Sequence, residues 1–235
     1  MSLDSVPPDT ALSHLANFDP RVAPVVGIDT HLPAVDPAAL QPQALRQRFA
    51  QPPSWEPEIW AERKFTERQP ALASVLIAVV TRPQPTVLLT ERTTHLSTHS
   101  GQVAFPGGKQ DPTDTDAIHT ALREAHEEIG LENDWVEVIG QMPTYTTGTR
   151  FIITPVVGLV HPDHRLVLNA YEVADAFEVP LKFLMNPAHH HRHAVDIGGV
   201  RREWLSMPYM DGNNERFVWG ATAAMLRNFY RFLVA

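Results

Sequence analysis

Short apolar runs separated by turn residues occupy the middle of this chain. The runs are rich in Val, Ile, Leu and Ala, and Pro83 and Pro85 mark a turn between the first two. This pattern predicts β-strands over the following residues: 73–80, 86–91, 102–105, 135–145, 151–160 and 173–179. The runs over 135–145 and 151–160 have the spacing of paired strands. We therefore expect a sheet in this part of the chain.

Two longer helices are predicted in the same part of the chain. One covers residues 116–129 and ends at Gly130, a residue type that commonly closes helices. The other covers residues 220–233, where apolar residues recur at helical spacing and predict packing on the core. Residues 181–185 predict a short helix or a turn. The mixture of strands with two or three helices predicts an α/β or α+β fold.

The first seventy residues carry weaker patterns. Residues 1–35 are rich in Pro, Asp and Ala without periodicity, which predicts a flexible or loosely packed arm. Asp36 and Pro37 have the residue types of an N-cap and a first helical position, and they predict a short helix through about residue 49. Residues 56–69 predict one further helical turn. We expect an N-terminal extension over residues 1–70, partly flexible with a short helix, and a main domain over residues 71–235.

The helix predicted over residues 116–129 carries three carboxylates. Glu124, Glu127 and Glu128 are three and four positions apart, so they share one helical face. Their mutual repulsion is most simply offset by a hard divalent cation, such as a Mg²⁺ ion that keeps several waters and holds a phosphate. Arg123 stands beside them, where it can orient Glu127. A solvated acidic surface is the alternative interpretation.

The sequence around these carboxylates resembles a known motif. Residues 123–131 read Arg-Glu-Ala-His-Glu-Glu-Ile-Gly-Leu, similar to the REUXEEXGU core of the Nudix box, in which U is a bulky apolar residue. The upstream acidic position falls at Asp114, eight residues instead of the usual seven precede Arg123, and Ala125 is small. The chain is identified as a member of the Nudix hydrolase superfamily. The resemblance implies an α/β/α sandwich with a mixed β-sheet between helices.

A second motif narrows the resemblance. Residues 88–92 read Leu-Leu-Thr-Glu-Arg and residues 101–108 read Gly-Gln-Val-Ala-Phe-Pro-Gly-Gly, similar to the additional signature of the coenzyme A pyrophosphatase subgroup. The longer spacing before Arg123 also fits that subgroup. Thr93 replaces the usual Ser or Ala, and Ser97 replaces the usual Arg. A hydroxyl does not mimic a guanidinium fork at a phosphate, and this departure leaves other substrates open.

The resemblance implies roles for particular residues. The implied metal ligands are three side chains and one backbone carbonyl: Glu124, Glu127, Glu128 and Gly108. The implied catalytic residues belong to the same helix: Arg123, Glu127 and Glu128. Glu127 is either a ligand or the base that activates water, and Arg123 orients a carboxylate. The candidate substrate-binding residues lie in several segments: Arg92, Gly107, Arg202 and Tyr209.

Several of these residues have a second interpretation. Tyr209 either stacks on an adenine or packs in the core. Asp111, Asp114 and Asp116 either form an outer cation site or serve as turn and N-cap residues. Glu172 either supplies an acidic group from another loop or lies at a strand edge on the surface.

Residues 189–193 read His-His-His-Arg-His. Adjacent residues on an irregular loop rarely converge on one metal ion, which argues against a transition-metal site. The second interpretation is a loop that borders the substrate pocket, where protonated His attracts phosphate below pH ~6.5.

The implied activity is a hydrolysis that depends on Mg²⁺ or Mn²⁺. It splits the diphosphate of coenzyme A and acyl-coenzyme A into 3′,5′-ADP and (acyl-)4′-phosphopantetheine. One alternative is a Nudix hydrolase of another nucleoside diphosphate derivative, such as ADP-ribose or NADH. The other is a noncatalytic module that senses a nucleotide, which the presence of Arg123 and all three box carboxylates argues against.

Composition limits the classes of partner and the cellular compartment that we expect for this chain. The net charge of −8 argues against a nucleic-acid backbone as the main partner. The absence of cysteine excludes disulfides and thiolate metal sites. The apolar run at 73–80 is far shorter than the ~20 residues of a transmembrane helix, and no signal peptide begins the chain. We expect a cytoplasmic protein with a small-molecule substrate and no membrane partner, and a homodimer is left open.

Overall fold

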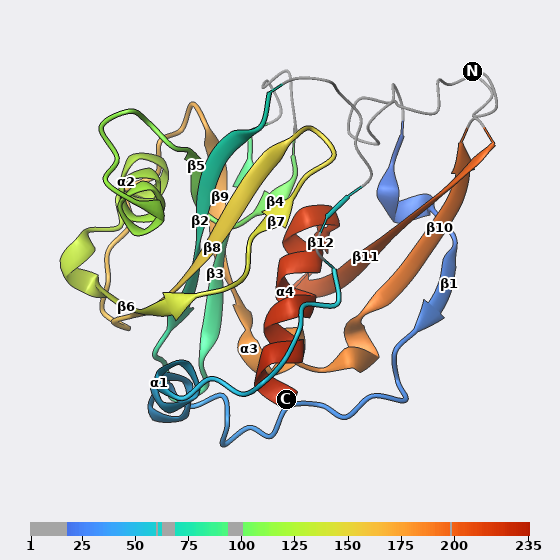
Figure 1. The fold of residues 1–235 in the computed structure, drawn as a ribbon, viewed down its shortest axis with the longest axis horizontal. Helices are drawn as coiled ribbons and strands as arrows, with labels where there is room; N and C mark the ends of the chain where they lie inside the picture. The colour runs from blue at the N-terminus through green and yellow to red at the C-terminus, as the bar shows by residue number, and fades with distance from the viewer. Residues whose placement is uncertain (1–17, 60, 63–68, 94–100, 198) are drawn as a thin grey trace.

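Two β-sheets form the framework of the computed structural model, which describes residues 18–59, 61–62, 69–93, 101–197 and 199–235 (Figure 1). The larger sheet has the strand order β4-β3-β2-β8-β6, and β5, β7 and β9 pair with β2, β8 and β3. Its strands are β2 (Ala71–Val80), β3 (Thr86–Arg92), β4 (Val103–Ala104), β5 (Gly107–Lys109), β6 (Val136–Gln141), β7 (Tyr145–Thr146), β8 (Phe151–Val160) and β9 (Val173–Pro180). All six predicted strand segments are therefore present, and the segment at 135–145 contains two strands.

The centre of the larger sheet is the pair β2 and β8. These strands run parallel and in register from Ala71 opposite Phe151 to Val80 opposite Val160. Both are almost entirely apolar, as strands covered on both faces must be. Because β3, β5 and β6 run antiparallel to this pair, the sheet is mixed, as predicted.

Helix α2 (Ala117–Ile129) covers one face of this sheet (Figure 1). Its buried residues Ala121, Ala125 and Ile129 pack in one cluster with Leu76 and Val156. Side chains alternate between the two faces of a strand, so β2 and β8 present their intervening residues to the opposite face.

The opposite face is covered by α1 (Pro42–Ala50), α4 (Gly220–Val234) and a second sheet. Leu45 and Phe229 lie there in the larger hydrophobic cluster together with Ile77 and Val157. The second sheet has the order β1-β10-β11-β12. Its strands are β1 (Val25–Ile28), β10 (His191–Ile197), β11 (Val200–Asp211) and β12 (Asn214–Trp219). The sandwich of helices around a mixed sheet is confirmed.

The helix predictions are confirmed at three places. The Asp116 side chain caps α2 by accepting a hydrogen bond from the backbone N–H of His119, and Gly130 ends the helix with a left-handed φ of 64°. Helix α4 lies where the C-terminal periodicity predicts it, and α3 (Leu181–Leu184) is the predicted short helix. No helix of the described residues is long and apolar enough to cross a membrane.

The predicted start of the first helix was wrong. Helix α1 begins at Pro42 instead of Pro37. Asp36 accepts a hydrogen bond from the backbone N–H of Ala38 in a preceding turn, so its capping side chain closes that turn and not a helix. In residues 56–59 the structure has no helix, and residues 63–68 of the predicted helical turn lie outside the described residues.

Two segments that the sequence predicts to be irregular are ordered strands. β1 lies within the predicted loose arm, after the short helix η3 (Pro20–Val22), and it pairs antiparallel with β10. β10 begins in the histidine run, which follows the short helix η5 (Pro187–His189). β1 is stabilised by a partner distant in sequence, whereas β10 pairs with β1 on one side and with the next strand, β11, on the other. The division of the chain at residue 70 stays a prediction, although Leu40 is buried in the larger cluster.

Candidate active site

Helix α2 presents two glutamates to the glycine-rich strand β5. Glu128 is only 4% exposed and accepts a hydrogen bond from the backbone N–H of Gly107, with an N–O distance of 3.1 Å. Gly108 lies directly against Glu124, because a Cβ atom at position 108 would overlap the Glu124 carboxylate. Glu124 and Glu128 are one helical turn apart, so both face the same strand. The structure thus brings together four residues of the predicted site.

Gly107 has a separate steric reason to be glycine. A Cβ atom at this position would overlap the backbone oxygen of Ser74 and the side chain of Val75, because β5 packs closely on β2. The close approach also points the Gly107 N–H at Glu128. Packing and site geometry therefore impose the same residue at this position.

Burial dominates the electrostatics of the two glutamates. It raises the pKa of Glu128 to about 7, and the nearby carboxylates of Glu124 and Glu172 add to this effect. The Gly107 N–H and the Arg92 guanidinium oppose it. Burial also raises the pKa of Glu124, with Arg123 opposing it and Glu127 and Glu172 adding to it. Charge on these side chains is therefore costly without a further cation.

Arg123 connects the loop before α2 to the helix itself. Its Nε and Nη2 atoms donate to the two oxygens of Asp114 at 2.9 and 2.8 Å. Nη1 donates to Glu127 at 2.9 Å and lies 3.0 Å from an oxygen of Glu124. Nη2 also donates to the backbone oxygen of Lys109 at 3.1 Å. The orienting role that the sequence suggested for Arg123 agrees with this geometry, and Asp114 is the main partner.

The loop aspartates act through hydrogen bonds in this structure. Asp114 also accepts from the Asp111 N–H at 2.8 Å and from the Thr120 hydroxyl at 3.0 Å. The two Arg123 hydrogen bonds hold the pKa of Asp114 well below its usual range. Asp116 is the N-cap of α2. For Asp114 and Asp116, the geometry favours the structural interpretation over an outer cation site.

Arg92 reaches the same site from the end of β3. Its Nη1 atom lies 3.6 Å from an oxygen of Glu128. Glu172 approaches from the segment before β9, where its backbone oxygen accepts from the Thr93 N–H and its side chain accepts from Asn169 at 3.3 Å. Its carboxylate is close enough to raise the pKa of both Glu124 and Glu128. The site therefore contains a fourth acidic side chain that comes from outside α2.

Arg202 and Tyr209 lie in the second sheet. Arg202 is buried in β11 opposite Val195, near the β10–β11 turn, which is across the molecule from α2 (Figure 1). The Tyr209 ring packs edge-on against Phe183, with 5.0 Å between ring centroids. The structure therefore does not bring Arg202 to the carboxylates, and it favours the core interpretation of Tyr209. The sequence alone could not show whether Arg202 and Tyr209 contact the substrate or pack elsewhere, because their place relative to α2 depends on the fold.

Two histidines of the run, His190 and His193, have ring partners within the protein. The ring of His190 is buried between the Leu184 carbonyl and Arg227, and burial lowers its pKa to about 4. The ring of His193 stacks on Trp204 and bonds the Ser206 hydroxyl at 2.8 Å. His191 and His193 are two positions apart in β10 and so lie on the same side of that strand, whereas His190 precedes it. The structure therefore gives His190 and His193 packing roles, and not a place at a pocket that binds phosphate.

The carboxylates on α2 fit an oxygen-binding divalent cation. In the described part of the chain no group of three or more His, Asp or Glu residues is arranged around a common metal position, and Arg123 contacts both Glu124 and Glu127. Glu124 and Glu128 nevertheless have raised pKa values, and the Arg92 nitrogen is 3.6 Å from Glu128. A hard cation would offset this repulsion with the ligand type it prefers.

The class of the protein follows from the fold, the site and a family comparison. The family model described as the NUDIX domain matches residues 71–195, which is more than half of the 235 residues. The chain therefore belongs to the Nudix family. It is a Nudix hydrolase, an enzyme of the family that acts on nucleoside diphosphate derivatives.

The chain is also similar to individual proteins of this family. It is 45% identical over 158 residues to the Nudix hydrolase NudL of Escherichia coli strain K12, which covers 66% of this chain and 79% of that protein. It is 43% identical over 155 residues to NudL of Yersinia enterocolitica, covering 66% and 77%. Among solved structures, the Nudix hydrolase RenU of M. smegmatis aligns with a TM-score of 0.41 and 24% identity, covering 52% of this chain and 73% of that one.

Proposed function

We propose that this Nudix hydrolase is a pyrophosphatase of coenzyme A and acyl-coenzyme A that depends on Mg²⁺ or Mn²⁺. The products are 3′,5′-ADP and (acyl-)4′-phosphopantetheine. One observation carries the proposal: the segment similar to the coenzyme A signature forms the wall of the site. From that segment, Arg92 lies 3.6 Å from Glu128, Gly107 donates to Glu128, and Gly108 lies against Glu124.

The metal would be held by Glu124 and Glu128, together with the Gly108 carbonyl and with Glu127. When bound, a divalent cation polarises a phosphoryl oxygen and lowers the pKa of its water. The protein supplies the positions. Gly107 and Arg92 fix the Glu128 carboxylate, and Arg123 fixes Glu124 and Glu127 relative to β5, whose last residue is Lys109.

Glu127 differs from its two neighbours in exposure. Its side chain is 56% exposed, whereas those of Glu124 and Glu128 are 16% and 6% exposed. Arg123 holds it at 2.9 Å. This combination of a fixed orientation and access to water suits either a metal ligand or the base that takes a proton from water.

A turnover screen tests the proposal. The protein is incubated with Mg²⁺ or Mn²⁺ and with coenzyme A, acetyl-coenzyme A, ADP-ribose or NADH, and the products are identified by mass. Release of 3′,5′-ADP from coenzyme A, at a kcat/KM well above that of the other substrates, is the expected result. A preference for ADP-ribose or NADH would keep the Nudix chemistry and reject the substrate. The Ser at position 97 is the observation that favours this second candidate.

A noncatalytic role has its own signature in the same screen. A nucleotide-sensing module would bind nucleotide in the presence of Mg²⁺ without turnover. Activity of the parent that is lost in Glu124→Gln would exclude this role, because that substitution removes one carboxylate charge at nearly unchanged volume.

A further inference from the structure

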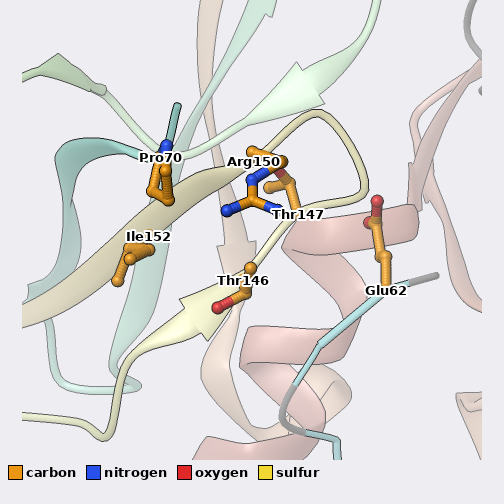
Figure 2. Close-up of a pocket in the computed structure, with 6 residues that line it drawn as sticks. All are labelled: Glu62, Pro70, Thr146, Thr147, Arg150 and Ile152. Atoms are coloured by element: carbon orange, nitrogen blue, oxygen red, sulfur yellow. The ribbon is translucent and has the colours of Figure 1, made fainter. Parts of the chain in front are cut away.

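A small cavity lies beside the hairpin that joins β7 to β8 (Figure 2). Its volume is about 210 Å³. It is lined by residues of three chain segments: Glu62, Pro70, Thr146, Thr147, Arg150 and Ile152. None of these residues belongs to the Nudix helix or to the motifs that identify the family. The cavity is therefore a separate feature of this chain.

Arg150 occupies an unfavourable backbone position in this hairpin. Its φ is 70°, and among the described residues it is the only non-glycine residue with a positive φ. Its N–H donates to the Thr147 oxygen, and the Thr147 N–H donates to the Phe151 oxygen, both at 2.9 Å. This is a three-residue loop in which a turn is followed by a left-handed residue, a position that glycine fills without strain. Strain retained in this way is characteristic of functional positions.

The cavity presents donors that the protein does not use. Among the described residues, neither the Arg150 guanidinium nor the Thr146 hydroxyl has a side-chain hydrogen-bond partner. Arg150 extends from the hairpin between Thr147 and Ile152, as Figure 2 shows. A guanidinium with free donors at a concave surface is suited to a phosphate, which it binds through paired hydrogen bonds.

Glu62 is the one acidic side chain at the cavity, and it is already engaged. Its two oxygens accept from the Tyr145 hydroxyl at 3.1 Å and from the Gly148 N–H at 2.9 Å. Burial raises its pKa, so it carries its charge less readily than an exposed glutamate. These bonds hold the hairpin in place and leave the Arg150 guanidinium as the charged group free to meet a ligand.

Strand register places Ile152, one of the residues that line the cavity, on the same face of the sheet as the Nudix helix. Ile152 has the side-chain parity of Val156, which packs in the cluster with Ala125 of α2. β8 lies beside β2, and β2 lies beside β5, where Gly108 is opposite Ser74. Two strand spacings across and about three residues along correspond to roughly 10 Å in each direction. A nucleotide bound by its diphosphate at α2 can bridge that separation to the long Arg150 side chain.

We propose that this cavity receives a phosphomonoester that the substrate carries away from its scissile diphosphate, with Arg150 and Thr146 as the residues that bind it. The inference rests on the proposed function, and for coenzyme A the group is the 3′-phosphate of the ribose.

A pair of substrates tests this site. Arg150→Gly removes the guanidinium and suits the left-handed backbone, so the variant folds at least as stably as the parent. Its KM for coenzyme A is expected to rise tenfold or more, whereas its KM for dephospho-coenzyme A, which lacks the 3′-phosphate, changes less than twofold. Arg165→Gln, which removes one exposed positive charge elsewhere, serves as the control and leaves both constants unchanged. An equal change for the two substrates in Arg150→Gly overturns the site and leaves the proposed function intact.

A binding measurement distinguishes failure of the proposed function from failure of the proposed phosphomonoester site. If the parent turns over neither substrate, the proposed function fails. Calorimetric titration with 3′,5′-ADP and with 5′-AMP then tests the cavity alone. Tighter binding of 3′,5′-ADP by the parent, lost in Arg150→Gly and kept in Arg165→Gln, supports the phosphomonoester site. Equal affinities of the parent for the two nucleotides overturn it.

Discussion

Replacing Asp114 by Asn tests whether the loop before α2 stabilises the position of Arg123. The Asp114 side chain is fully buried and accepts four hydrogen bonds, two from Arg123, one from Asp111 and one from Thr120. Hydrogen bonds to charged groups each contribute about 1.5–3 kcal/mol, and Asn retains only part of them. We expect the free energy of unfolding to fall by about 2–4 kcal/mol.

The pH dependence of this loss follows from the pKa of Asp114. Arg123 lowers the folded-state pKa below the ordinary value of 3.8, so the stabilisation is present above about pH 4 and is lost as the pH falls further. The difference in unfolding free energy between the parent and Asp114→Asn is therefore constant near neutral pH and shrinks in acid. Urea denaturation of both proteins at several pH values measures it.

The control is Asp111→Asn. The hydrogen bond of Asp111 to Asp114 comes from the backbone N–H, which the substitution keeps, so its stability should stay within about 0.5 kcal/mol of the parent. If Asp114→Asn unfolds at the same urea concentration as Asp111→Asn, the hydrogen bonds of the Asp114 side chain do not stabilise the fold. A difference between the two that persists unchanged at low pH would show that charge is not its cause.

Three further substitutions test other residues, of which Ser97 lies outside the described residues. Glu128→Gln should lower kcat by at least about 100-fold. It should also stabilise the metal-free protein at pH 8 by about 2–3 kcal/mol, because ionised Glu128 becomes costly as the pH rises from 4.5 to its raised pKa of about 7. An unchanged melting temperature refutes the predicted stabilisation. Gly108→Ala should reduce kcat/KM at least about tenfold, since its methyl group displaces Glu124, while circular dichroism remains native; full activity contradicts the close approach. Ser97→Arg should lower the KM for coenzyme A, and an unchanged KM would show that another basic group already serves.

Local signals explain why the Nudix helix could be predicted from sequence. Asp116 and Gly130 mark its ends, and both act through hydrogen bonds and backbone angles within a few residues. Glu124 and Glu128 share a face because of helix geometry alone. The arrangement of the glutamates on α2 therefore depends on short-range rules.

Long-range pairing explains what the sequence did not predict. Val25 in β1 lies opposite His193 in β10, and β1 is only four residues long. Arg202 looks like a candidate phosphate ligand in the sequence, but β11 buries it in the second sheet. Arg150 gave no signal in the sequence, because its left-handed conformation and its place at a cavity are visible only in three dimensions.

Around α2, the positively charged side chain of Arg123 is already paired with Asp114. Two of the hydrogen bonds of Arg123 go to Asp114, which leaves its remaining positive charge shared between Glu124 and Glu127. Arg92 is the cation nearest Glu128, and Glu172 adds further negative charge. The site therefore retains uncompensated negative charge where a metal would bind. Asp114 contributes to this excess indirectly, because without it Arg123 would be free to neutralise the carboxylates and would compete with the metal for them.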